Sequence, residues 1–320
     1  MFEKLKTPAF LKAARDTSGK PFSLAKTLLV FLLVYIIATF LESAVLSPVM
    51  LALFFTREEY LTSFRSAMTS GDQTAMLEAV DRLAASEAVV VATLFAASAA
   101  AVAAIVYCRM IEKRSFLSMG IRKKRAVSSS LFGALFALLL VFGALAFALA
   151  FGACTVSFGE TPRPSMLLLL FFGFLLEGFA EEVLFRGYLT VSLARGKSLR
   201  ASIFVGALLF AYFHRAGAGV TPLAFLNFFL FGVLASLYMI RGGNLFGAAA
   251  LNGFFKIGMV LFLGSPVSGQ KYSASLLSLS LAEDAALLHG GAFGLEGGLA
   301  VTCALTFGIA LLLMARTKED

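Results

Sequence analysis

Residues 166–187 read MLLLLFFGFLLEGFAEEVLFRG, an apolar run that also contains three glutamates and an arginine. A bilayer core about 30 Å thick is crossed by about 20 apolar residues in a helix. Ionisable side chains inside such a helix cost a few kcal/mol each and face a cavity or a partner. Glu177 and Glu181 lie one helical turn apart. Glu182 and Arg186 have the same spacing. The segment therefore predicts a membrane helix with one polar, functional face.

The whole chain has the composition of a membrane protein. Of its 320 residues, 59% are hydrophobic and 14% are charged, and the mean hydropathy is +0.89. Soluble domains are about half apolar and about a quarter charged, which excludes the soluble class. The three cysteines, Cys108, Cys154 and Cys303, lie in or beside apolar runs. They exclude a disulfide scaffold, and no Cys pair has metal-ligand spacing.

Eight apolar runs have lengths near that of a membrane span. We expect an all-α, polytopic membrane helix bundle of about eight transmembrane helices, with an overlong first helix that contains Glu42 and Pro48. The predicted runs are 24–55, 87–108, 128–152, 165–190, 200–216, 222–240, 244–263 and 297–315.

The basic residues alternate between connections, which is the pattern of membrane topology rather than of nucleic-acid binding. Because the net charge of +8 is concentrated in every second connection, we expect both termini on the cytoplasmic side and no nucleic-acid partner. The residues on this side are Lys4, Lys6, Lys12, Arg15, Lys20 and Lys26 in the tail, Arg109, Lys113, Arg114, Arg122, Lys123, Lys124 and Arg125 in the second connection, and Arg195, Lys197, Arg200, Arg241, Arg316 and Lys318 later.

Two long segments fall on the opposite side. Residues 56–86 carry apolar residues at helical spacing, which predicts a short helical hairpin. Residues 264–296 are rich in Ser and Gly and contain His289, which we interpret as a turn residue beside Gly290 and Gly291.

Two more polar residues lie at the depth of the glutamates. With a rise of about 1.5 Å per residue, Glu182 lies about 16 Å above the cytoplasmic end of its helix, and His214 lies about 21 Å above the start of the next helix. Asn252 lies about 12 Å above the start of the seventh helix. Three helices therefore bring polar groups to one layer, which predicts a shared cavity.

Carboxylates, an imidazole and an amide in a secluded pocket suit the activation of water. A glutamate general base does this directly, and a metal does it by lowering the pKa of its bound water. A zinc centre with Glu and His ligands is chemically reasonable. Asn252 suits an oxyanion donor better than a ligand, and Arg186 is suited to hold a carboxylate.

The stretch Glu181-Glu182-Val-Leu-Phe-Arg186-Gly187 resembles the Glu-Glu-x-x-x-Arg motif of the CAAX-protease and bacteriocin-processing (Abi) family of intramembrane proteases. Phe210-Ala-Tyr-Phe-His214 resembles the second family motif, Phe-x-x-x-His. Segments 114–120, 229–246 and 290–298 are similar to further parts of the family, so that the likeness covers roughly 105–300.

The resemblance implies an intramembrane endopeptidase that hydrolyses a peptide bond of a membrane-associated protein or peptide in a multi-pass protein of the bacterial plasma membrane. It implies catalytic roles for Glu181, Glu182, Arg186, His214 and Asn252. It also implies a divalent metal, zinc being expected, with Glu181, Glu182 and His214 as ligands. The chain departs from the family at Asn252 and Lys256, where the third motif usually has a His and an Asn.

The interpretation divides the chain into residues 1–126, with the tail and two transmembrane helices, and residues 127–320, a protease core of about six helices. Two rival hypotheses remain open. The replacement at Asn252 favours a non-catalytic membrane adaptor or immunity-type protein that keeps the fold. Carboxylates within the membrane are also typical of transporters.

Overall fold

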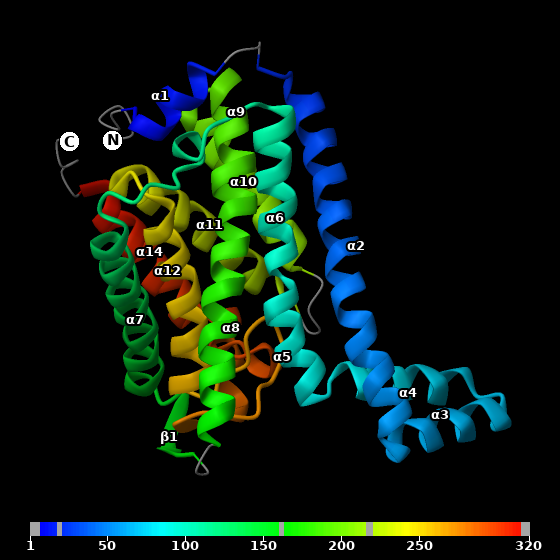
Figure 1. Cartoon of the computed structure of the whole chain (residues 1–320). Helices are drawn as coiled ribbons and strands as arrows, with labels where there is room; N and C mark the ends of the chain where they lie inside the picture. Colours follow the sequence, from blue (N-terminus) through cyan, green and yellow to red (C-terminus); the bar gives the residue numbers. More distant parts are fainter. Residues whose placement is uncertain (1–6, 18–20, 160–162, 216–219, 315–320) are drawn as a thin grey trace.

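The computed structural model describes residues 7–17, 21–159, 163–215 and 220–314, and it confirms an all-α membrane bundle (Figure 1). The predicted ends at 216 and 315, and the basic residues Lys4, Lys6, Lys20, Arg316 and Lys318, lie outside the described residues. The α-helices are α1 (Ala9–Arg15), α2 (Leu24–Thr56), α3 (Glu58–Ser70), α4 (Gln73–Ala84), α5 (Glu87–Ala96), α6 (Ser98–Val106), α7 (Ala126–Ala150), α8 (Pro164–Glu182), α9 (Val191–Gly196), α10 (Leu199–His214), α11 (Pro222–Gly242), α12 (Leu245–Ile257), α13 (Ala286–His289) and α14 (Leu299–Met314).

Every predicted apolar run contains a helix. Among the described residues, five helical stretches are long and apolar enough to cross a membrane: Leu24–Thr56, Glu87–Ile111, Ala126–Ala150, Pro222–Gly242 and Leu245–Phe262. The helices α10 and α14 are apolar but shorter. The remaining run is α8, which carries the glutamates.

The outer surface of the bundle is apolar. Phe40 of α2 is 73% exposed, and Leu131 and Phe132 of α7 are 60% and 65% exposed. Exposing such a surface to water is unfavourable, whereas lipid tails are as apolar as these side chains. The protein is therefore an integral membrane protein.

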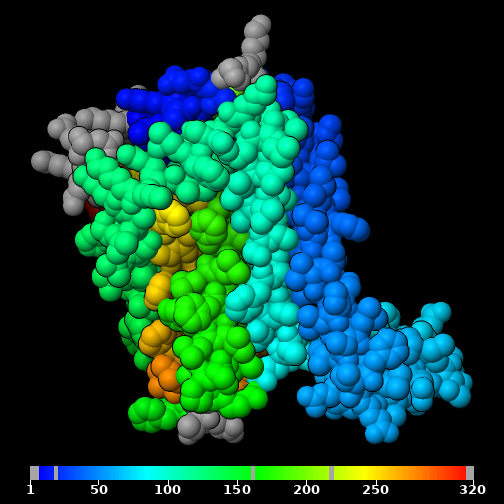
Figure 2. All heavy atoms as spheres, viewed as in Figure 1, coloured from blue at the N-terminus to red at the C-terminus, as the bar shows by residue number. Residues whose placement is uncertain are grey.

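Helix α2 runs along the edge of the bundle and carries the predicted hairpin at its far end. It continues for 33 residues through Pro48, about 50 Å at the rise of a helix, which exceeds the thickness of a bilayer core. The hairpin of α3 and α4 projects sideways from the bundle (Figures 1 and 2). Asp72 caps α4 by accepting hydrogen bonds from the backbone N–H groups of Thr74 and Ala75. The predicted helical hairpin is thus present.

A small sheet, which the sequence did not predict, joins two connections. Strand β1 (Cys154–Phe158) pairs antiparallel with β2 (Leu277–Leu281), and Val156 lies opposite Leu279. Nearby, His289 Nε2 lies 2.8 Å from the carbonyl oxygen of Ala282, and its Nδ1 accepts a hydrogen bond from Gly291 N at 3.1 Å. His289 therefore holds a turn, as predicted.

The helices α7, α12 and α8 form the packed centre of the bundle. Glycines allow these helices to approach closely. A Cβ atom on Gly178 of α8 would lie 2.6 Å from the backbone nitrogen of Gly253 in α12, and one on Gly133 of α7 would lie 2.2 Å from the carbonyl oxygen of Gly247. Small residues at helix crossings are typical of membrane bundles. This close approach brings α12 within side-chain reach of the α8 glutamates.

We expect Gly178→Ala to destabilise the protein by about 1–3 kcal/mol, because backbone atoms of α12 must move to admit the new methyl group. The measurement is the midpoint of thermal unfolding in detergent. Gly143→Ala in α7 is the matched control, since no atom lies within 4 Å of its added Cβ. Equal midpoints for the two variants would contradict the close contact.

Candidate active site

The polar face of α8 is confirmed as one buried cluster. Helix α8 ends at Glu182 and continues as a π-helical turn, Val183–Thr190, which contains Arg186. Arg186 Nη1 lies 2.9 Å from Glu182 Oε1, and both side chains are almost fully buried. The other oxygen, Glu182 Oε2, has no hydrogen-bond partner in the described part of the chain. Single π-turns within helices are often found at functional sites.

Glu181 faces His214, which stands at the end of α10. His214 Nε2 lies 3.3 Å from Glu181 Oε1, and His214 Nδ1 lies 2.8 Å from the carbonyl oxygen of Phe210. A carbonyl only accepts, so Nδ1 carries a proton and Nε2 is the nitrogen that exchanges one. About 15% of each of these two side chains is exposed, against none of the Glu182 side chain. Glu181 and His214 are therefore more accessible than Glu182, while Glu177 is 22% exposed.

Asn252 of α12 joins the two neighbouring glutamates. Its Nδ2 donates to Glu181 Oε2 and to Glu182 Oε1, each at 2.9 Å. These two bonds use both hydrogens of the amide group. In this arrangement Asn252 positions the two carboxylates, and its role as an oxyanion donor stays a prediction.

Lys256, one turn after Asn252, supplies a second cation to the cluster. Its Nζ lies 2.8 Å from Glu177 Oε2 and 2.8 Å from Glu181 Oε1, and the residue is 7% exposed. Lys256 thus pairs with Glu177 and Glu181, whereas within the described residues Arg186 forms its ion pair with Glu182. Glu177, which had no predicted catalytic role, is the lysine's other partner.

The predicted residues Glu181, Glu182, Arg186, His214 and Asn252 come together from α8, its π-turn, α10 and α12. The predicted zinc centre fits this arrangement poorly, because an ammonium group already lies against two of the three carboxylates. Within the described ranges, no group of three or more His, Cys, Asp or Glu residues is arranged to hold a metal ion. No step below is therefore derived through a metal.

A further carboxylate near the site was missed in the sequence. Glu296, in the connection before α14, is 8% exposed and accepts a hydrogen bond from Ser268 N at 2.7 Å. It lines a small cavity together with His214, Asn252 and Lys256. Burial raises the pKa of the Glu296 carboxyl above its ordinary value. Its neighbourhood of glycines gave no periodic signal that would have placed it here.

Helix α2 also contributes to this region. The ring of Tyr35 packs on Phe213 of α10 with 4.0 Å between ring centroids. Glu42, which stood out in the sequence as a carboxylate in an apolar run, lies about two helical turns after Tyr35 on the same helix. Helix α2 therefore borders the region of the site through its contact with α10.

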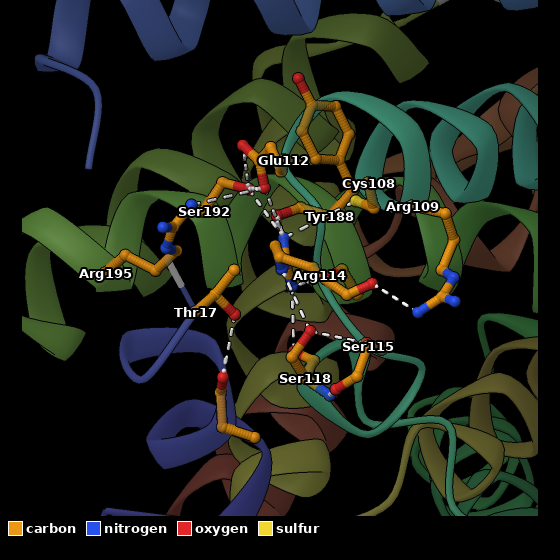
Figure 3. A network of polar contacts seen from close by, with 12 residues as sticks. Thr17, Cys108, Arg109, Glu112, Arg114, Ser115, Ser118, Tyr188, Ser192 and Arg195 are labelled. Carbon is orange, nitrogen blue, oxygen red and sulfur yellow. Dashed lines mark hydrogen bonds and ion pairs between the residues drawn. The ribbon is translucent and has the colours of Figure 1, made fainter. Parts of the chain in front are cut away.

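On the side of the bundle where α1 lies, an arginine network supports the π-turn (Figure 3). The fully buried Arg114 donates from Nη2 to the carbonyl oxygens of Gly187, at 2.8 Å, and Ser118, at 2.9 Å. From Nη1 it donates to Ser192 Oγ at 2.8 Å and to Glu112 Oε2 at 3.1 Å. The sequence counted Arg114 among the basic residues of the second connection, and the structure adds that its side chain is fully buried.

The network fixes the part of the chain that directly follows Arg186. Ser192 Oγ donates to both oxygens of Glu112, at 3.0 and 2.8 Å. The guanidinium of Arg114 thus joins the second connection to the carbonyls of the π-turn. Because that turn sets the direction of Arg186, Arg114 is a positioning residue for the site.

Comparison with protein families agrees with this geometry. Residues 163–257 match the family described as type II CAAX prenyl endopeptidase Rce1-like. The match covers under a third of the chain and includes every site residue on α8, its π-turn, α10 and α12. Over this segment the chain is similar to the CAAX-protease and bacteriocin-processing family. The match supports an intramembrane protease as the general class. No curated protein matches the chain.

We expect Arg114→Ala to lower the free energy of unfolding by about 3–5 kcal/mol, because it leaves Glu112 buried without its main cation. The thermal midpoint in detergent should fall by several degrees. Lys123→Ala removes the same charge from an exposed position in the same connection and should leave the midpoint unchanged. If both variants behave alike, the Arg114 network does not hold the π-turn.

Proposed function

We propose that the protein is an intramembrane endopeptidase in which Glu181 and His214 activate water for hydrolysis of a peptide bond. The observation that carries this proposal is the pairing of Glu181 Oε1 with His214 Nε2 at 3.3 Å, beside a buried carboxylate–arginine pair. With a proton on Nδ1, a neutral His214 presents a lone pair to the carboxylate. A water molecule beside this pair can donate a hydrogen bond to either group, and either group can take one proton from it.

In the proposed reaction the water loses a proton to this pair, and its oxygen forms a bond to the carbonyl carbon of the peptide. The carbonyl becomes an oxyanion. When the C–N bond breaks, the proton passes to the departing nitrogen, as expected for general acid–base catalysis. Arg186 and Asn252 hold Glu182 and Glu181 in place and exchange no proton. Glu182 is the alternative base because of its unpartnered Oε2.

The substrate class follows from the site's location and from the matched family. A site within an apolar bundle reaches peptide bonds at or within the membrane, so we propose a membrane-associated protein or peptide as the substrate. The description of the matched family adds prenylated proteins as one candidate group. The distribution of Lys and Arg supports a cytoplasmic location of both termini, and we place the protein in the bacterial plasma membrane.

A second candidate function is a non-catalytic membrane adaptor. It is favoured by one observation: Asn252 and Lys256 engage the carboxylates that a hydrolase needs free. In this case the cluster would serve stability alone.

We expect Glu181→Gln to lower hydrolysis by about 10²–10⁴-fold, because the amide cannot take a proton from water. The measurement is a comparison of protein N- and C-termini by mass spectrometry in membranes from cells that lack the protein and carry either wild type or the variant. Termini that depend on wild type identify the substrate.

Glu78→Gln, on the exposed face of α4, is the matched control and should release the same termini as wild type. A Glu182→Gln arm decides between the two candidate bases. Identical termini for wild type and Glu181→Gln, at equal abundance, would reject Glu181 as the base. If the Glu182→Gln and His214→Ala proteins also match wild type, the adaptor replaces the protease.

A further inference from the structure

Lys256 brings a full positive charge into the bundle from α12, opposite the glutamates of α8. The residue is 7% exposed, and its neighbours on the helix are apolar. Burying an ammonium group is unfavourable unless charged partners surround it. Glu177 and Glu181 provide these partners at 2.8 Å each. The sequence places the two glutamates one turn apart on α8, so that one cation lies against both.

This position conflicts with a divalent metal at the same carboxylates. A metal bound to Glu181 and His214 would share Glu181 Oε1 with the Lys256 ammonium. Two cations at one oxygen repel each other strongly where little water screens them. The lysine therefore neutralises the carboxylates in the way that a bound metal does elsewhere.

The hydrogen-bond capacity of Lys256 is not used up by the glutamates. An ammonium group has three N–H donors, and the two carboxylates account for two of them. The amide of Asn252 has both hydrogens engaged. Lys256, Asn252 and His214 border the same small cavity. Of these groups, Lys256 has the donor that is available to a carbonyl oxygen there.

We propose that Lys256 is the built-in cation of the site: it holds Glu177 and Glu181, takes the place of a divalent metal, and donates its third N–H to the carbonyl oxygen under attack. Oriented cationic donors stabilise the oxyanion more than they stabilise the starting carbonyl. The oxyanion role rests on the proposed function. The exclusion of a metal does not.

The first experiment measures metal binding by the full-length protein in detergent, and it needs no substrate. Wild type, Lys256→Arg and Lys256→Gln are equilibrated with zinc and then analysed by equilibrium dialysis and elemental mass spectrometry. Wild type and Lys256→Arg should bind no stoichiometric zinc. The zinc affinity of Lys256→Gln should be at least about tenfold higher than that of wild type, since the competing cation no longer lies against Glu181.

A second variant guards against misfolding. The double variant Lys256→Gln, Glu177→Gln has one buried carboxylate fewer without a cation than Lys256→Gln has. Its zinc affinity should also exceed that of wild type. One equivalent of zinc on wild type that is lost in Glu181→Gln would overturn the proposal. So would unchanged zinc affinity in both variants that lack the lysine.

The second experiment uses a substrate identified from the new termini. Lys256→Gln should lower kcat by about 10²–10³-fold with little change in KM, because the donor acts on the oxyanion. Lys256→Arg, which keeps a cationic donor, should retain more of kcat than Lys256→Gln. A lysine with a merely structural role does not predict a change confined to kcat. Equal kcat in wild type and Lys256→Gln overturns the oxyanion role. If wild type hydrolyses nothing, the proposed function and this oxyanion role fail together, while the metal measurement still decides whether Lys256 replaces a metal.

Discussion

The site depends on the balance of buried charges between α8 and its neighbours. Glu177, Glu181 and Glu182 lie in a segment that is otherwise apolar, and an unpaired carboxylate there is costly. Arg186 pairs with one of them from the same helix, whereas Lys256 pairs with the other two from α12. The close contact of Gly178 with Gly253 holds α12 against α8, and Lys256 of α12 lies 2.8 Å from both glutamates.

The π-turn after Glu182 sets the position of Arg186 relative to the glutamates. A π-turn displaces backbone carbonyls from the regular helical ladder, and two of them, those of Gly187 and Tyr188, accept hydrogen bonds from Arg114. The site is therefore supported from outside its own helices, by a connection more than 70 residues earlier in the chain. The site and its support are therefore built alike, because Lys256 and Arg114 are both buried cations bound by several oxygen atoms.

Much of the fold and part of the site could be predicted from the sequence. Apolar run length located the helices, and the helical rise brought Glu182, His214 and Asn252 to one layer, as the structure confirms. The strands β1 and β2 were missed although Leu277–Leu281 alternates between Leu and Ser, because five residues without a known partner do not define a strand. The sequence indicated that Lys256 could compete with Arg186 for the carboxylates, but which carboxylates it contacts depends on the rotation of α12 against α8. Run length does not fix that rotation. The buried position of Arg114 was missed because a basic residue between two spans is normally solvated.

The buried arginine also constrains the order in which the protein is assembled. Arg114 is synthesised long before Gly187 and Ser192, and until they are in place its charge must stay in water at the membrane surface. It becomes desolvated only when α8 and the π-turn arrive and offer their oxygens. The second connection therefore reaches its final packing only after the helix with the glutamates is in place. In a chain that stops before residue 187, Arg114 keeps Glu112 and Ser118 of its own connection but lacks the carbonyl of Gly187 and the hydroxyl of Ser192.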